Sequence, residues 1–193
     1  MSKQTIAART GVLTVALALM SACSIRSPHM TPVTSGAQIV RPGEGRALVF
    51  FTRPSSYGGA IQATIYDGDA YIGTVSGGTH VAYETTPGTH LFMVVGESAD
   101  FMQADLLPDK TYYAGVHARM GVWKARFSFV PFNGSDVKHG RDEVEDSRQV
   151  AVNDEGRRWA MQNAPSIAEK KRAYLPAWER KSHQQTLHPD SGI

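Results

Sequence analysis

Short runs of β-branched and aromatic residues recur from Arg46 onward, and turns containing Gly or Pro separate them at intervals of about eight to twelve residues. This regular spacing is typical of an all-β sandwich. We therefore predict a mainly β fold, an antiparallel β-sandwich of about eight strands with a C-terminal helical segment packed on it. The predicted strands lie near residues 46–53, 60–66, 69–75, 79–85, 89–96, 99–107, 111–119 and 122–131.

Asp67-Gly68 predicts a two-residue hairpin turn, because this dipeptide accepts the positive φ angles that such turns require. In the expected register Ala63 faces Ile72 and Ile65 faces Ala70. One face of the hairpin then carries Ile61, Ala63, Ile65 and Ile72, and the other carries Gln62, Thr64, Tyr66 and Tyr71. Such a split between apolar and polar residues is what a half-buried antiparallel pair shows.

Pro87-Gly88 suits the centre of a type II turn, since Pro presets φ and Gly accepts a positive φ. Read as a hairpin, this turn pairs Thr85 with His90 and Tyr83 with Phe92. Both faces of the following strand are apolar, so we expect that strand to be buried on both sides. Its second side must be covered by something other than the facing sheet.

The C-terminal segment, residues 133–193, is the candidate cover. Residues 134–147 are charged and irregular, and residues 148–152 can add a short strand. Asn153 is a suitable N-cap for a helix, because Asp and Glu in the next two positions favour the helix dipole.

We predict that this helix runs to about Asn163 and breaks at Pro165, and that a second helix runs to about Leu175. One apolar stripe combines Ile167, Tyr174, Leu175 and Trp178, with Trp159 upstream. We expect the stripe to dock on the sheet, and the alternative is a helix that binds a partner. The chain from Glu179 onward is expected to be frayed.

The N-terminus has the pattern of a secretory signal peptide. Residues 1–10 hold Lys3, Arg9 and no acid, and residues 11–20 (GVLTVALALM) are uncharged and apolar. This apolar run is shorter than the about 20 residues that a membrane-spanning helix needs. We predict a signal peptide over residues 1–22.

Met20-Ser21-Ala22-Cys23 resembles the lipobox of bacterial lipoproteins, in which a bulky apolar residue and two small residues precede the lipidated cysteine. Cys23 is the sole cysteine, so lipidation would leave the mature protein without an intramolecular disulfide. The alternative is an ordinary signal peptide and an incidental cysteine. Ser24 follows Cys23, and by resemblance to Gram-negative sorting this indicates the outer membrane. We expect a palmitate-bearing N-terminus and a body in the periplasm.

Residues 23–45 are predicted to be the lipidated N-terminus and a tether. They are rich in Ser, Pro, Thr and Gly and show no sustained periodicity. We expect a flexible linker with a root-mean-square length of about 25 Å. The β-sandwich domain is then expected to comprise residues 46–132.

Four motifs follow one another between Ile65 and Tyr113: Ile65-Tyr66-Asp67-Gly68, Ile72-Gly73-Thr74, Pro87-Gly88-Thr89-His90 and Leu107-Pro108-Asp109-Lys110-Thr111-Tyr112-Tyr113. Phe51-Thr52-Arg53-Pro54 lies upstream. In order and spacing these motifs resemble the PEGA-type β domain and related lipoprotein domains of unknown function. The resemblance covers about half of the chain. It implies a small β-sandwich of a cell-envelope protein, with no catalytic residues to carry over.

Charge and motif content argue against several function classes. Of the 20 Lys and Arg residues, Lys3 and Arg9 are expected to be removed, which leaves 18 against 18 Asp and Glu residues. A neutral protein lacks the basic field that nucleic-acid binding needs. The predicted register puts His80 and His90 on opposite faces, and no thiolate remains, so we expect neither a metal site nor a cofactor. Ser135-x-x-Lys138 matches a penicillin-binding motif without its K-T-G strand, and we interpret it as chance.

Tyr66 and Tyr71 are the candidate binding residues. The predicted register places them diagonally on the polar face of the first hairpin, close enough to form an exposed aromatic platform. Such a platform would stack on sugar rings, and peptidoglycan is the nearest glycan. The alternative is that both are ordinary strand residues, half-covered by the C-terminal segment.

The leading hypothesis is a lipoprotein of the outer membrane that is not an enzyme. It would act as a structural or protein-interaction module of the cell envelope, bound to the membrane through Cys23. A glycan-binding module that uses Tyr66 and Tyr71 is the second hypothesis, and a hydrolase is the third. The expected partners are an envelope protein or peptidoglycan.

Overall fold

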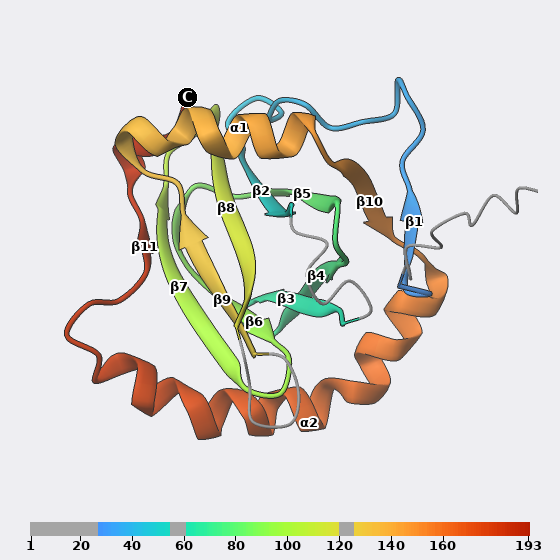
Figure 1. The fold of residues 1–193 in the computed structure, drawn as a ribbon, viewed down its shortest axis with the longest axis vertical. Coiled ribbons are helices and arrows are strands. Elements are labelled where there is room, and N and C mark those ends of the chain that lie inside the picture. Colours follow the sequence, from blue (N-terminus) through green and yellow to red (C-terminus); the bar gives the residue numbers. More distant parts are fainter. Residues whose placement is uncertain (1–26, 55–60, 120–125) are drawn as a thin grey trace, which may run out of the picture.

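The computed structural model describes residues 27–54, 61–119 and 126–193. These residues form four layers (Figure 1): helix α1 (Val137–Glu145), a six-stranded sheet, a five-stranded sheet and helix α2 (Asp154–Glu179). The prediction of a mainly β fold is confirmed. Short 3-10 turns at Gly134–Asp136 (η1) and Pro189–Ser191 (η2) complete the elements.

The six-stranded sheet has the order β1 (Met30–Pro32), β10 (Arg148–Val152), β5 (Thr79–Thr85), β2 (Ala47–Arg53), β8 (Lys110–Arg119) and β9 (Arg126–Pro131). The five-stranded sheet has the order β11 (Thr186–Leu187), β7 (Ala99–Leu106), β6 (Gly88–Val95), β3 (Ala63–Asp67) and β4 (Ala70–Val75). The predicted strands correspond to β2 through β9, although residue 60 and residues 122–125 lie outside the described part of the chain.

The prediction of a purely antiparallel sandwich is wrong, because both sheets are mixed. Strand β2 runs parallel to β8, β10 runs parallel to β5, and β11 runs parallel to β7. Each of these pairs joins strands that are far apart in sequence. Turn chemistry between consecutive strands therefore carries no information about them.

The hairpin of β3 and β4 keeps its predicted faces but not its predicted register. Asp67 pairs with Ala70, so the turn consists of Gly68, with a φ of 57°, and Asp69. A bulge follows, and Ile65 pairs with Gly73 instead of Ala70. Because the expected and observed registers near the turn differ by two residues, side chains keep their sides.

Pro87-Gly88 does not form a hairpin turn. Strand β5 pairs with β2 and β10, and β6 pairs with β3 and β7, so the turn carries the chain from one sheet to the other. The predicted pairing of Tyr83 with Phe92 is replaced by an edge-to-face contact between the sheets, with ring centroids 6.2 Å apart. The same turn residues serve both kinds of connection.

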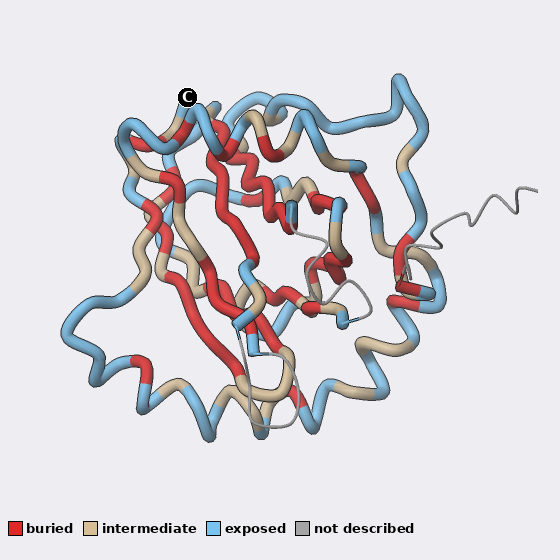
Figure 2. Tube along the Cα trace, in the orientation of Figure 1, coloured by how far each residue is buried: buried red, intermediate tan, exposed pale blue. Residues whose placement is uncertain are grey.

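Alternation along the central strands builds three apolar layers, and buried segments concentrate in the strands (Figure 2). In β2, Val49 and Phe51 point to the core between the sheets, whereas Leu48 and Phe50 point to α1. In β6, the core between the sheets receives Phe92 and Val94, and the layer beneath α2 receives Met93 and Val95. The prediction that this strand is buried on both sides is confirmed.

The C-terminal segment covers the five-stranded sheet, as expected, but as one helix of 26 residues. Pro165 and Pro176 both lie inside α2, whose course curves along the sheet (Figure 1). Each Pro removes one backbone hydrogen bond and bends a helix. Burial of Ile167 and Trp178 against the sheet keeps the helix continuous. The Asn153 N-cap is confirmed, since the Gly156 amide donates to Asn153 Oδ1 over 2.8 Å.

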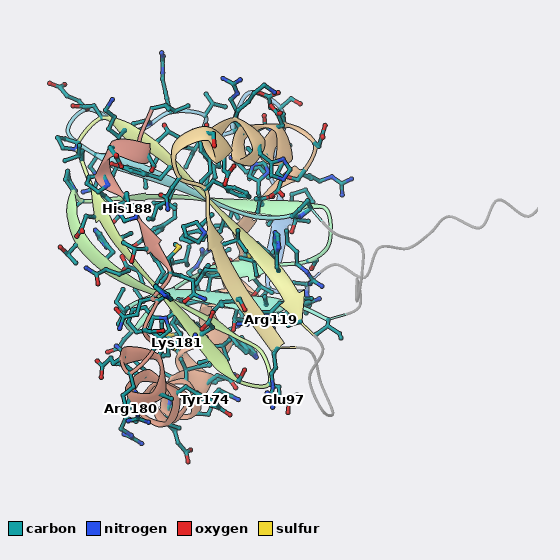
Figure 3. The ribbon with its side chains drawn as sticks, turned by 60° about the vertical axis from the view of Figure 1, so that its left-hand side comes forward. Glu97, Arg119, Tyr174, Arg180, Lys181 and His188 are labelled. Atoms are coloured by element: carbon teal, nitrogen blue, oxygen red, sulfur yellow. The ribbon has the colours of Figure 1, made fainter. Side chains whose placement is uncertain are left out.

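Two further expectations for the C-terminal segment are wrong. Residues 134–147 are not irregular, because they contain η1 and α1. The chain after Glu179 is not frayed, because Leu187 is buried in the core and Ile193 exchanges backbone hydrogen bonds with Thr111. Lys181 and Arg119, labelled in Figure 3, form ion pairs with Asp100. The Lys181 Nζ and Asp100 Oδ1 atoms lie 2.8 Å apart, and the Arg119 Nη2 and Asp100 Oδ2 atoms lie 3.5 Å apart. The Lys181 contact joins the chain just after α2 to β7.

Candidate binding pocket beneath helix α2

The N-terminal strand β1 lies beside the beginning of α2 (Figure 1), so the described part of the expected tether is not free. Met30 is buried in the core, and its sulfur accepts the Thr74 amide at 3.2 Å. The same sulfur lies 3.7 Å from the Tyr71 hydroxyl oxygen. The low-complexity composition hid this strand, which pairs with β10.

The start of α2 is built to hold this N-terminal segment. The Asn153 side chain donates to the Pro28 carbonyl over 2.8 Å, and its backbone amide donates to the His29 carbonyl over 3.1 Å. Gly156 lets the helix approach closely, because a Cβ at this position would lie 2.4 Å from the same His29 oxygen. The ring of His29 stacks on Trp159, with centroids 4.7 Å apart.

A pocket of about 420 Å³ lies between α2 and the β3–β4 hairpin. Its lining is mostly apolar and consists of Tyr66, Asp69, Tyr71, Ala160, Met161, Ala164, Ile167 and Ala168. Ala160, Ala164 and Ala168 follow one another at four-residue intervals, which places them on one face of the helix. Their short side chains leave the space that larger residues would fill.

Tyr66 lines the pocket with its ring, while its hydroxyl is enclosed. Its exposed fraction is 2%, and its hydroxyl finds no hydrogen-bond partner among the described residues. Burial raises the pKa of Tyr66 well above its usual value, although the neighbouring Thr64 side chain partly offsets this. The Tyr66 phenol is therefore neutral, and its hydroxyl is enclosed at the wall of the pocket.

Tyr71 differs from Tyr66 because its hydroxyl is satisfied. The hydroxyl oxygens of Tyr71 and Thr74 lie 2.6 Å apart. Burial raises the pKa of Tyr71 as well. The two tyrosine rings lie 5.6 Å apart, directly paired across the hairpin and not diagonally. The expected exposed platform is wrong, because α2 covers Tyr66.

The pocket continues toward the C-terminal half of α2. A second hollow of about 460 Å³ shares Asp69 and Ala168 with it and is also lined by Lys171, Arg172, Leu175, Pro176 and Glu179. The Lys171 Nζ and Asp69 Oδ1 atoms form an ion pair of 2.8 Å at the boundary. The apolar pocket thus opens beside a charged rim.

The other sequence candidates do not join this site. Cys23 lies outside the described residues. His80 and His90 lie in different sheets, where His80 Nδ1 meets Ser147 Oγ at 2.8 Å and His90 Nδ1 meets Asp67 Oδ2 at 2.7 Å. Within residues 27–54, 61–119 and 126–193, no three His, Cys, Asp or Glu side chains gather to hold a metal ion.

Alternation along the hairpin predicts that Tyr66 and Tyr71 share a face, but the α2 side of the pocket was not predicted. The available signal was the repeat of Ala160, Ala164 and Ala168 in the same apolar segment as Ile167. Small residues at this spacing mark a helix face that leaves room at its contact surface.

Among the described helices, none has both the length and the apolar character needed to cross a bilayer. Comparison of the chain with protein-family models, with curated proteins and with solved structures finds no match.

Proposed function

We propose that the protein is a lipoprotein of the outer membrane, held at the periplasmic face through a lipid on Cys23. Its body acts as a binding module of the cell envelope, and the pocket beneath α2 is its binding site. The observation that carries this proposal is the mostly apolar pocket of about 420 Å³ between α2 and the β3–β4 hairpin. Apolar walls of this kind gain free energy when a ligand with an apolar body covers them.

The position of the N-terminal segment limits how far such an anchor would let the body move from the membrane. Ser27 is buried in the body and lies four residues after Cys23. Four residues span at most about 14 Å. A lipid on Cys23 would therefore hold the body close to the headgroups, and not at the end of a long tether.

The pocket favours a small ligand with an apolar body. Its volume of about 420 Å³ falls within the range of small-molecule sites. A sugar ring is less suitable, because apolar walls leave its many hydroxyls without partners. The pocket therefore supports the glycan hypothesis less well than a ligand with an apolar body.

The experiment that tests the function combines labelling with fractionation. Cells that express the wild type or Cys23→Ser are fed alkyne-palmitate, and the membranes are separated by density. We expect label in the wild type, in the outer-membrane fraction, and none in Cys23→Ser. Absence of label from the wild type would refute anchoring by lipid.

A further inference from the structure

We propose that the pocket beneath α2 holds one acyl chain of the protein's own N-terminal lipid when the protein is outside a bilayer. This inference rests on the proposed lipidation of Cys23 and names the occupant of the proposed binding site. The occupant is part of the segment that precedes Ser27, the first described residue.

The N-terminal segment meets the body beside the pocket. Met30 contacts Tyr71, which lines the pocket. His29 stacks on Trp159, whose ring lies 5.8 Å from that of Tyr71. The chain thus enters the fold beside the pocket.

The chain between Cys23 and His29 is long enough to bring a lipid to the pocket. Cys23 precedes His29 by six residues, which span at most about 20 Å when extended. His29 lies close to the pocket, because its ring stacks on Trp159 and the next residue, Ala160, lines the pocket. A lipid on Cys23 therefore reaches the pocket without any rearrangement of the body.

The walls of the pocket are chemically suited to an acyl chain. The face formed by Ala160, Ala164 and Ala168, together with Met161 and Ile167, offers carbon atoms to an acyl chain. The pocket volume of about 420 Å³ lies near the lower end of the range of small-molecule sites, which suits one acyl chain better than several.

In this arrangement the pocket would shield an acyl chain from water. An acyl chain in water exposes apolar surface, which favours aggregation, and a chain inside the pocket does not. A bilayer offers every chain of the lipid an apolar environment, so insertion empties the pocket. The pocket would shield part of the anchor while the protein is in the aqueous periplasm.

The test uses a palmitate analogue that carries a photoreactive diazirine and is incorporated metabolically into the full-length protein. The lipoprotein is purified in a short-chain detergent and diluted below the micelle concentration, or reconstituted in phosphatidylcholine vesicles. After irradiation, cross-linked peptides are identified by mass spectrometry. In the diluted protein we expect cross-links within one chain, from the N-terminal lipid to residues 159–168 or to the β3–β4 hairpin. In vesicles we expect these cross-links to be replaced by cross-links to phospholipid.

Two variants make the result specific. Ala164→Trp fills the pocket, and Met161→Glu puts a charge at its lip on a side chain that is 71% exposed, so the second change leaves folding intact. We expect each to reduce the intramolecular cross-links about tenfold or more. Ala173→Trp, on the exposed side of α2, is the matched control and should leave them unchanged.

The outcomes separate this inference from the proposed function. If the wild type takes up no analogue, or if Cys23→Ser takes up as much, the lipoprotein proposal itself fails. If the label is incorporated but the diluted protein shows no cross-links to the pocket, only the inference is overturned. Cross-links between two chains, or a foreign lipid that copurifies in the pocket, overturn it as well, because they identify another occupant.

Discussion

The imidazole ring of His29 stacks on the indole ring of Trp159, with centroids 4.7 Å apart and planes inclined by 26°. This contact joins the first described segment to the helix that covers the five-stranded sheet. The Asn153 side chain and the backbone at Gly156 hold the same segment. The N-terminal segment and α2 therefore form one structural unit, and the pocket lies next to it.

Gly156→Ala should destabilise the protein, although Ala is the better helix former. In an exposed helix the change from Gly to Ala gains about 1 kcal/mol. Here the added Cβ would lie 2.4 Å from the His29 carbonyl oxygen, so we expect a net loss of about 2 kcal/mol in urea unfolding. Hydrogen exchange of the Asn153 amide should accelerate, because it bonds to that oxygen. Ala173→Gly is the control and should leave that exchange unchanged; a Gly156→Ala variant more stable than the wild type would contradict the close packing.

Tyr66→Phe and Tyr71→Phe should change stability in opposite directions. Tyr66→Phe removes a buried hydroxyl without a partner, and we expect a gain of about 1 kcal/mol in the free energy of unfolding. Tyr71→Phe breaks the hydrogen bond to Thr74 and should cost about 1 kcal/mol. Urea unfolding of the unlipidated Cys23→Ser background measures both. Equal losses in the two variants would mean that the Tyr66 hydroxyl has a partner.

Trp178→Ala should lower the free energy of unfolding far more than Tyr174→Ala. Trp178 is 5% exposed and packs on Phe101 with ring centroids 5.9 Å apart, so its truncation should cost about 3–5 kcal/mol. Tyr174 lies on the same helix (Figure 3) but is 37% exposed, and its truncation should cost less than about 1 kcal/mol. Thermal and urea unfolding measure the difference. Similar losses would show that α2 does not dock through Trp178.

Acid should destabilise the fold through His80. Burial lowers the pKa of this imidazole to about 4 in the folded state, from an ordinary value of about 6.5 in the unfolded chain. Because Ser147 Oγ donates to the Val144 carbonyl, neutral His80 donates its Nδ1 hydrogen to Ser147. Between these two pKa values the unfolded state binds more protons, so stability falls as the pH decreases through this window.

The expected loss from His80 between pH 7 and pH 4 is about 3 kcal/mol. His80→Gln keeps a side-chain donor and removes the titration, so its urea midpoint should depend less steeply on pH in this range. The comparison isolates His80, since all other titrating groups are common to both proteins. Parallel pH profiles would show that His80 is not buried in its neutral form.

Strand positions could be predicted because alternation is a local property. In β2 and β6, neighbouring residues point to different apolar layers, and both strands were located to within one or two residues. Sheet membership could not be predicted in the same way. Pro87-Gly88 offers the same backbone conformation to a hairpin and to a connection between sheets, and only the pairing of distant strands decides between them.

The helical cover was predicted from the apolar stripe, but its continuity through Pro165 was not. Local propensity ends a helix at Pro, whereas burial of Ile167 and Trp178 on one sheet face favours a single bent helix. The candidate site was half predicted for a similar reason. Alternation placed Tyr66 and Tyr71 on one face of the hairpin. The helix that covers this face, α2, is distant in sequence, so its contact with the hairpin could not be predicted.

The most direct test of the lipoprotein proposal is the mass of the N-terminal peptide from protein extracted from membranes. We predict that the mature chain begins at Cys23 and that this residue carries acyl groups. An unmodified Cys23, or a mature chain that begins at another residue, would contradict it.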